Sequence, residues 1–427
     1  TDNVAVGSYA LNASTTGNNN TAVGDSAGLS VTTGTINTLI GALAGDALTT
    51  GNSNVAVGYN TLSGDTKGDR STAIGMQALA LQNFTTNTDA YNTAVGYNAG
   101  YSVTTGVQNT IMGGLSGDSI TTGSNNTALG YATLSENTTA SNNTAVGFKA
   151  LIVNTTGANN VAVGADSLDS NTTGDNNVAV GMDALQANTS GLTNTAVGQA
   201  ALSANTTGDS NTAVGRLAGS SITTGYENTL IGYAAGDALT TGSNNIIIGQ
   251  SVDADSVSQA NAIVIGVGFV GAGNDFSFGK AANVVSNDFN ADANWSRSSD
   301  IRLKKNIADQ TLGLSFINDL RTVKYNWKAS GELDASDAQL AHLREEDADG
   351  NIINHMDTDV VMHNFIAQEV KAALDAAGVS DFGGWKEDHH GVQQVSREMF
   401  VIPLVKAVQE QSALITALTA RIAALEE

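Results

Sequence analysis

Side chains capable of chemistry are concentrated in the last third of the chain. All five His and all three Trp residues lie beyond residue 285, and only five of the 18 Lys and Arg residues precede it. There is no Cys, so disulfides and thiolate metal sites are excluded. The His residues do not follow a pattern typical of a Ser-His-Asp triad. We expect no cofactor.

Three polar clusters in this third have simple structural interpretations. Ser299 and Asp300, considered alone, are typical of a helix N-cap pair. His389 and His390 lie beside two acidic residues, but a solvated loop explains this composition better than a metal site. Residues 345–350 carry alternating carboxylates without a complete calcium-loop pattern. We therefore expect no metal site.

The first two thirds of the chain, which must carry this region, are a repeat of the type Asn-Thr-Ala-Val-Gly. Fourteen of the fifteen spacings between the repeat Gly residues are 17 residues, and the other, from Gly75 to Gly96, is 21 because of an insertion around Asn83 to Ala90. Such regularity indicates one short unit stacked on itself. The repeat Gly residues are Gly7, Gly24, Gly41, Gly58, Gly75, Gly96, Gly113, Gly130, Gly147, Gly164, Gly181, Gly198, Gly215, Gly232, Gly249 and Gly266.

Each 17-residue unit is too short for a helix pair or a propeller blade. A sizeable apolar residue precedes every repeat Gly, and a small or apolar residue precedes that one, which predicts a short β-strand with two distinct faces. A second turn signal, usually Thr-Thr-Gly, follows about ten residues later. The pattern predicts a mainly β protein, a β-helix or β-roll whose coils each contain two short strands and two turns.

Two columns of the repeat have structural consequences. Asn stands four residues before the repeat Gly in all units except two, which have Ser71 and Ala262. Stacked Asn side chains can form an amide ladder, or Asn can simply tolerate a turn conformation. The small column, with Ala5, Ala22 and Ala56 among its members, predicts close approach of three chains about a common axis.

Residues 1–268 resemble the β-roll heads of trimeric autotransporter adhesins, whose repeats are also small-apolar-Gly units. They are similar as well to the Asn/Thr/Gly-rich repeats of phage tail-fibre proteins. A polar connector or tip over 269–298 separates this shaft from a new domain at 299–427. The resemblance implies an elongated homotrimer.

The end of the chain, residues 401–427, carries a heptad pattern. Its apolar residues alternate in steps of three and four, which predicts a trimeric coiled coil, and Gln411 is a polar member that can set register. A terminal helix packed on its own domain is the alternative. The expected seam is Val401, Leu404, Val408, Gln411, Ile415, Leu418, Ile422 and Leu425.

Four ordered segments resemble the endosialidase-type C-terminal intramolecular chaperone domain of phage tailspikes and tail fibres. They cover most of a small α+β domain, with Asn364 where the family pattern has Gly. The segments are 299–307 (SDIRLKKNI), 320–327 (LRTVKYNW), 365–370 (FIAQEV) and 400–410 (FVIPLVKAVQE).

The resemblance implies that this domain trimerises the fibre and then cuts itself off between Ser299 and Asp300. It implies Ser299 as nucleophile and Lys304 as general base, although spacing alone does not distinguish Lys304 from Lys305. A Ser hydroxyl needs such a base, and Lys serves when burial lowers its pKa. Ser299 cannot attack its own carbonyl carbon. Either it attacks the preceding carbonyl in an N→O shift, or a neighbouring protomer supplies the hydroxyl.

A further set of side chains follows the repeat Gly residues and is expected to form a stripe along the stacked coils. The stripe can bind a cell-surface glycan or protein, or it can pack between protomers, which we favour. A receptor-binding tip near Val267 to Ser286 is also expected if the last domain leaves. The aromatic members of the stripe are Tyr59, Tyr97, Tyr131, Phe148 and Tyr233.

Composition narrows the function class. The net charge of −23 disfavours nucleic acid and anionic membranes as partners, and no apolar run or leader predicts membrane insertion or a signal peptide. The shaft lacks the paired acids and aromatics of a glycosidase. We predict a structural and adhesive phage-type tail fibre of the virion, made in the host cytoplasm and joined to other tail proteins upstream. The alternatives are a bacterial trimeric adhesin and a glycan-binding or glycan-degrading tailspike.

Overall fold

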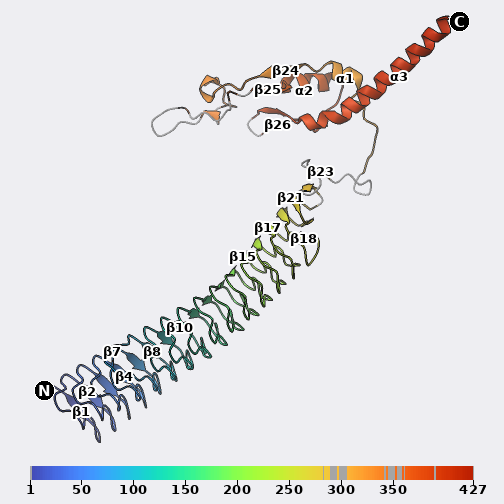
Figure 1. Ribbon diagram of the computed structural model, residues 1–427. Helices are drawn as coiled ribbons and strands as arrows, with labels where there is room; N and C mark the ends of the chain where they lie inside the picture. Colours follow the sequence, from blue (N-terminus) through green and yellow to red (C-terminus); the bar gives the residue numbers. More distant parts are fainter. Residues whose placement is uncertain are drawn as a thin grey trace. The chain divides into compact units, whose positions relative to one another are not determined.

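The computed structural model describes residues 2–281, 283–288, 296–297, 305–340, 343–344, 352, 358–359, 361–388 and 391–426. The chain divides into two compact units, Thr1–Ser299 and Asp300–Glu427. The first unit is a β-solenoid, which we call the shaft, and the second is a small domain with helices (Figure 1).

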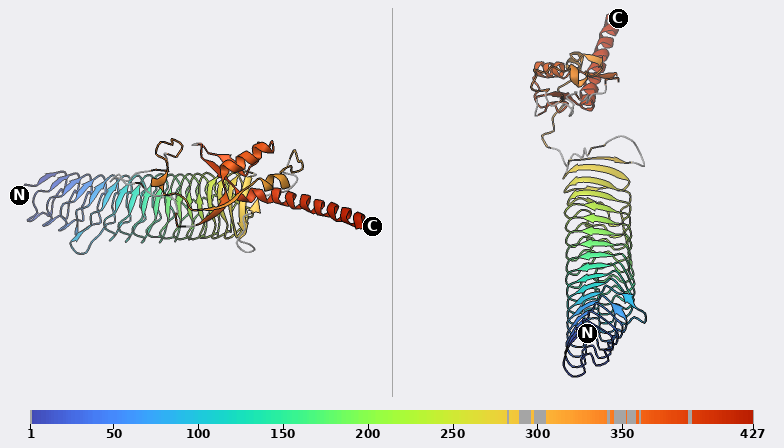
Figure 2. Two further views of the ribbon diagram at one scale, coloured as in Figure 1. Left: turned by 90° about the horizontal axis from the view of Figure 1, so that it is seen from above. Right: turned by 90° about the vertical axis from the view of Figure 1, so that its left-hand side faces the viewer.

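The shaft consists of about sixteen coils whose strands stack into one parallel sheet (Figure 2). Each strand pairs with the strand 17 residues away, so that Val178 faces Thr195 and Ala179 faces Ala196. The repeat spacing therefore sets the register. The strands are β1 (Val4–Val6), β2 (Thr21–Val23), β3 (Thr38–Ile40), β4 (Val55–Val57), β6 (Thr72–Ile74), β8 (Thr93–Val95), β9 (Thr110–Met112), β10 (Thr127–Leu129), β11 (Thr144–Val146), β12 (Val161–Val163), β13 (Val178–Val180), β14 (Thr195–Val197), β15 (Thr212–Val214), β16 (Thr229–Ile231), β17 (Ile246–Gln250), β19 (Ile263–Val267) and β21 (Asp275–Lys280).

The expectation of two strands per coil is wrong for most of the shaft. Only one three-residue strand recurs regularly, and the rest of each coil is made of turns. In the coil of Gly181, φ is +58° at Asp183 and +51° at Leu185, and a left-handed residue cannot continue a strand. The turns still bond to the next coil, since the Leu185 N–H donates to the Ala201 carbonyl at 3.0 Å.

The small column lies inside the coil of its own chain. Ala179 and Leu185 are both fully buried and belong to one continuous core along the shaft. The expectation that this column packs three chains together is therefore wrong, because its side chains are used within one chain.

Large strand residues are matched by Gly residues in the neighbouring turns. Leu39 takes the place of the small residue in β3, and a Cβ at Gly28 or Gly45 would come within 2.7 or 2.8 Å of its methyl groups. Both Gly residues stand where other coils have Leu, such as Leu62 or Leu185. Volume is thus exchanged between neighbouring positions, and the core stays filled. The same exchange occurs around Ile111, with Gly100 and Gly117, and around Leu230, with Gly219 and Gly236.

The Asn column forms a buried hydrogen-bond ladder. The side-chain oxygen of Asn177 accepts from the backbone N–H of Asn194 at 2.9 Å, and its amide donates to the Gly191 carbonyl at 2.8 Å. Where Ser71 interrupts the column, the Gln82 amide donates to the Ser71 hydroxyl and its oxygen accepts from Asn92, each at 2.9 Å. The ladder is therefore continued by a different side chain, and turn tolerance alone does not explain the column.

A second buried Asn ladder, which was not expected, follows seven residues after the repeat Gly. Four amide-to-oxygen bonds of 2.8 to 3.1 Å join its members, and it stops where the next coil has Ile222. The Asn205 oxygen at that end is buried and unpaired. The ladder comprises Asn137, Asn154, Asn171, Asn188 and Asn205.

The regular coil is modified at two places. The four-residue insertion forms an extra strand pair, β5 (Gly68–Asp69) with β7 (Thr88–Asp89), which projects from the regular outline (Figure 2). At the other end, β18 (Asp253–Ala254) pairs with β20 (Val270–Gly271). Strands β22 (Asn283–Asp288) and β23 (Ser296–Arg297) add antiparallel to β21. This change of direction caps the parallel sheet.

The second unit is built around an aromatic core. Phe400 is 2 % exposed and packs against Phe316, Phe365 and Phe382, with ring centroids 4.9 to 6.2 Å apart. Its elements are α1 (Leu314–Asn318), β24 (Thr322–Tyr325), the 3₁₀ turn η2 (Ser330–Glu332), β25 (Met362–Phe365), α2 (Ala367–Ala376), β26 (Trp385–Glu387), β27 (Gln393–Val395), η4 (Arg397–Phe400) and α3 (Val401–Glu426).

Replacing one ladder residue, Asn177→Ala, leaves the Asn194 N–H and the Gly191 carbonyl buried without their partner. We expect a loss of about 2–4 kcal/mol in stability, seen as a lower melting temperature by circular dichroism. The control is Thr173→Ala, in an exposed turn of the neighbouring coil. Equal melting temperatures for the two variants would show that the ladder contributes nothing.

Stability of the C-terminal end of the shaft should depend on pH through Asp253. Burial and a hydrogen bond shared with the Asp237 carboxyl raise the pKa of Asp253 to about 6. The folded state therefore binds this proton more tightly than the unfolded state, so stability falls as pH rises from about 4 to about 6. Melting curves of Asp253→Asn should show a flatter slope across that window, whereas parallel curves for both proteins would contradict the assignment.

Candidate functional site

The residues predicted to perform the self-cleavage lie outside the part of the chain that the structure describes. Residues 298–304 include Ser299, Asp300 and Lys304, so the structure gives no geometry for them. Lys305 is described and its side chain is exposed. The His389-His390 pair and residues 345–350 also lie outside the described ranges.

The other three family-like segments are described, and they converge on one core. Residues 320–327 form β24, residues 365–370 form the end of β25 and the start of α2, and residues 400–410 begin α3. Strands β24 and β25 pair antiparallel, with Thr322 opposite Phe365. Phe400 then packs on Phe365 at 4.9 Å between ring centroids. Segments far apart in the sequence thus meet in the core of the second unit.

An ion pair joins two of these segments. The Arg321 guanidinium grips the Glu369 carboxylate with two nitrogens, at 3.1 Å for Nε and 2.5 Å for the terminal nitrogen. The guanidinium lowers the pKa of Glu369, and the carboxylate raises that of Arg321. Both side chains are solvent-accessible, so the pair orients α2 beside β24 more than it stabilises the domain.

A second polar contact ties α3 to α1. The Glu410 carboxylate accepts a hydrogen bond of 2.7 Å from the backbone N–H of Leu314, the first residue of α1. The N-cap position of α1 is Gly313, whose own side chain cannot make such a bond. Glu410 supplies the missing acceptor from 96 residues away. Sequence reasoning did not assign roles to Arg321, Glu369 or Glu410, although all three lie within the quoted segments.

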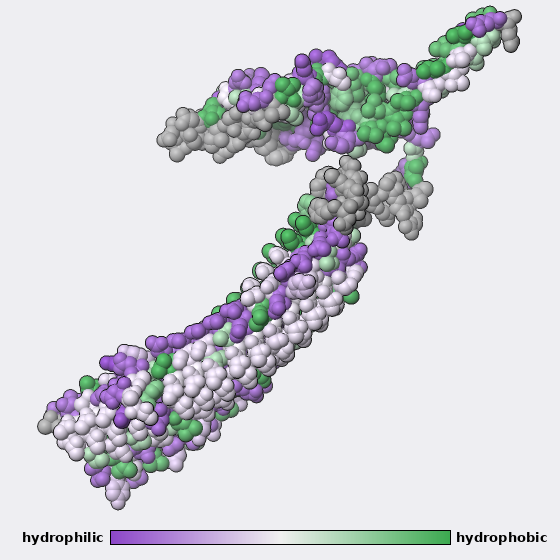
Figure 3. Space-filling view, in the orientation of Figure 1, coloured by the Kyte–Doolittle hydropathy of each residue, from purple (hydrophilic) through white to green (hydrophobic). Residues whose placement is uncertain are grey.

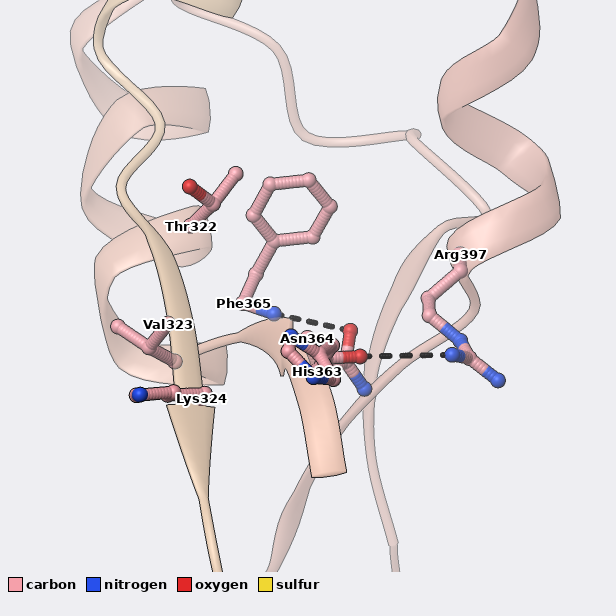
Figure 4. Close-up of a pocket in the computed structure, with 7 residues that line it drawn as sticks. All are labelled: Thr322, Val323, Lys324, His363, Asn364, Phe365 and Arg397. Carbon is pink, nitrogen blue, oxygen red and sulfur yellow. Dashed lines mark hydrogen bonds between the residues drawn. The ribbon is translucent and has the colours of Figure 1, made fainter. Parts of the chain in front are cut away.

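A shallow pocket of about 400 Å³ lies beside the β24–β25 pair (Figure 4). Its lining includes three basic side chains, Lys324, His363 and Arg397, and Arg397 donates to the His363 carbonyl at 3.4 Å. The hydroxyl in the lining is that of Thr322, and no carboxylate of the described residues lines the pocket. The pocket does not assemble a nucleophile, a base and an orienting acid.

Helix α3 carries the predicted seam, and its apolar side chains are largely uncovered within the single chain. Val408 is 62 % exposed, Ile415 57 % and Leu418 55 %. Gln411 is exposed on the same helix. The first turns of α3 contribute to the core through Pro403 and Ala407, whereas the described residues from Gln411 to Glu426 are exposed.

The predicted stripe on the shaft is exposed in the single chain. Its five aromatic members are 45 to 53 % exposed. Tyr131 stacks on Phe148 with ring centroids 5.8 Å apart, and Arg216 lies over the Tyr233 ring at 5.6 Å. Side chains one coil apart therefore touch, as stacking of 17-residue units requires. This arrangement does not distinguish a receptor surface from a surface between protomers.

Comparison with known proteins bears on the second unit. The family model of the chaperone of endosialidase, peptidase S74, matches residues 299–379. The chain thus carries a chaperone-of-endosialidase domain at its C-terminal end, behind a β-solenoid shaft. The matched range contains Ser299 and Lys304 as well as the Arg321–Glu369 pair.

No curated protein and no solved structure gives a match to the chain. Among the described residues, no helix has the length and apolar character needed to cross a membrane. In the same residues, no group of three or more His, Asp and Glu side chains is placed to hold a metal ion.

Removing the Glu410 carboxylate should loosen α1 from α3. We expect Glu410→Ala to destabilise the second unit by about 1–2 kcal/mol, the usual cost of losing a cap. Hydrogen exchange at the Leu314 amide is the direct measurement, and it should become faster. The matched control is Glu426→Ala, at the exposed far end of the same helix. Unchanged protection at Leu314 would rule out this role.

Proposed function

We propose that this protein is the subunit of a homotrimeric phage-type fibre whose C-terminal domain assembles the trimer and then cleaves itself off. The match of residues 299–379 to the chaperone of endosialidase, directly behind a long repeat shaft, carries the proposal. A chaperone that is part of the chain acts once per molecule, which suits a repetitive structural protein better than a turnover enzyme.

Trimerisation through α3 is supported by its uncovered apolar side chains. A helix of 26 residues with Leu, Ile and Val at heptad spacing buries them by association with copies of itself. Gln411 would lie in the seam and fix the register of the three helices. The aromatic core of the second unit holds the start of α3, so that the helices of three chains can be presented together.

Self-cleavage is proposed from the segment 299–305. The Ser299 hydroxyl loses its proton to Lys304 and attacks a peptide carbonyl carbon, which forms an ester as the C–N bond breaks. The departing amine takes the proton from Lys304, and water then hydrolyses the ester. If the hydroxyl comes from a neighbouring protomer, cleavage requires assembly and reports that the trimer has formed.

Outside the chemistry, the proposed role is adhesion. The fibre would belong to a virion tail, join other tail proteins through its upstream end and meet a glycan or protein on the host surface. The exposed aromatic stripe and the residues from Val267 to Ser286 are the candidate contact surfaces. A bacterial trimeric adhesin and a glycan-binding tailspike remain the alternative classes, and identification of the bound particle or cell envelope distinguishes them.

The test is mass spectrometry of the purified full chain under denaturing and native conditions. In the wild type we expect two products that meet at Ser299–Asp300, and a native mass of three chains. Ser299→Ala and Lys304→Ala should each give an uncleaved trimer, whereas the neighbouring Lys305→Ala should still cleave. An intact wild-type trimer would refute the self-cleavage, and a monomer would refute the assembly.

A further inference from the structure

One face of the shaft carries an apolar column that the chain itself leaves uncovered. The residue before each repeat Gly is always Val, Ile, Leu or Met, and the column continues to Phe278 because β21 pairs with β19. No member is buried, in contrast to the fully buried residue beside it in each strand, such as Ala196 beside Val197. We call this set the outer apolar column: Val6, Val23, Ile40, Val57, Ile74, Val95, Met112, Leu129, Val146, Val163, Val180, Val197, Val214, Ile231, Ile248, Ile265 and Phe278.

The outer apolar column is wide enough to be a surface rather than a line. Residues two apart in a strand point to the same side, so the column is flanked by Thr195 and its equivalents, which are Thr, Val or Ile in every coil. Neither the column nor this flank contains a charged residue. The face that Figure 3 displays is instead mostly pale, with a hydrophilic band along one edge of the shaft.

The amount of exposed apolar surface exceeds what an isolated shaft should carry. Val197 is 37 % exposed, Ile231 39 % and Leu129 44 %. With roughly 60 Å² left accessible on each member, the column exposes on the order of 1,000 Å², against about 300–600 Å² for the largest patch of a typical monomer. A specific interface buries about 800 Å² on each partner, so the column alone is large enough for one.

Periodicity selects the partner. The column repeats once per coil, at the spacing of about 4.8 Å between neighbouring strands. A partner that covers it from β2 to β21 must present apolar groups at the same spacing, and a second copy of this shaft in the same register does so. A glycan or a compact receptor domain does not match a repeat of this length.

We propose that the outer apolar column is the surface by which the shafts of this protein pack on one another, in place of the inner Ala column. The proposal rests on the homotrimer proposed above and names the face that it uses. Three columns meet around the common axis, equivalent residues of the three chains lie at the same height, and the polar turns face outward. Aromatic residues directly after the repeat Gly, such as Tyr131 and Phe148, lie at the margin of this interface.

The natural absence of Cys makes the test direct, because a single introduced thiol is the only one in the chain. Val197→Cys places it on the column, and Ser190→Cys places it on an exposed turn of the preceding coil. Both are small substitutions at positions that are accessible in the isolated chain. The full-length proteins are treated with a maleimide and, separately, with a short bis-maleimide, and their native masses are measured.

The proposal predicts that Val197→Cys is at least tenfold slower to react with the maleimide than Ser190→Cys and is cross-linked between chains. Ser190→Cys should be labelled at the rate of the unfolded chain and stay uncross-linked. A trimer in which both thiols react equally fast would overturn this interface and leave the proposed trimer standing. A monomeric native mass would overturn both. Val163→Cys, two coils away on the same column, repeats the comparison if the first variant does not fold.

Discussion

The shaft depends on the pairing of each coil with the next through buried Asn side chains. A coil made mostly of turns exposes backbone N–H and carbonyl groups toward its own interior, where no water is available. Each Asn in the first ladder accepts from the N–H of the next Asn and donates to a Gly carbonyl in the following turn, as Asn177 does with Asn194 and Gly191. The side chain thus replaces part of the backbone pairing that a second strand would have provided, and every coil becomes a template for its neighbour.

That constraint explains why variation in the repeat is compensated instead of free. Where Ser71 removes an amide, Gln82 restores the connection from another position. Where Leu39 enlarges a strand, Gly28 and Gly45 make room in the turns on either side. In both cases the correction lies in a neighbouring turn, because a stacked coil can relax only against the coils above and below it. The repeat is therefore strict in spacing and hydrogen bonding but tolerant in the size of individual core residues.

The regular parts of the molecule could be predicted from the sequence, and the local conformations could not. Identical spacing and a recurrent Asn require stacking, so the solenoid and its register followed directly. The single strand per coil did not follow, because the left-handed φ of residues such as Leu185 has no signal in a residue type that avoids it. The use of the inner Ala column was misjudged since a small residue can face a partner or its own Leu. At the C-terminal site, the family-like segments located the domain, but the Glu410 contact with Leu314 bridges 96 residues and no spacing rule predicts it.

A shaft of nearly identical coils has a register problem that the irregular coils and the C-terminal domain together address. A shift by 17 residues keeps most contacts between stacked repeats, so misaligned chains would differ little in energy from aligned ones. The coils with Leu39, Ile111 and Leu230 are unevenly spaced, and the insertion before Gly96 interrupts the period, so a shifted pairing places large groups against Leu and not against Gly. These markers act only after coils have begun to stack. In the proposed assembly, a domain that gathers the three chain ends at α3 sets the register before stacking begins, and each coil then copies it along the shaft.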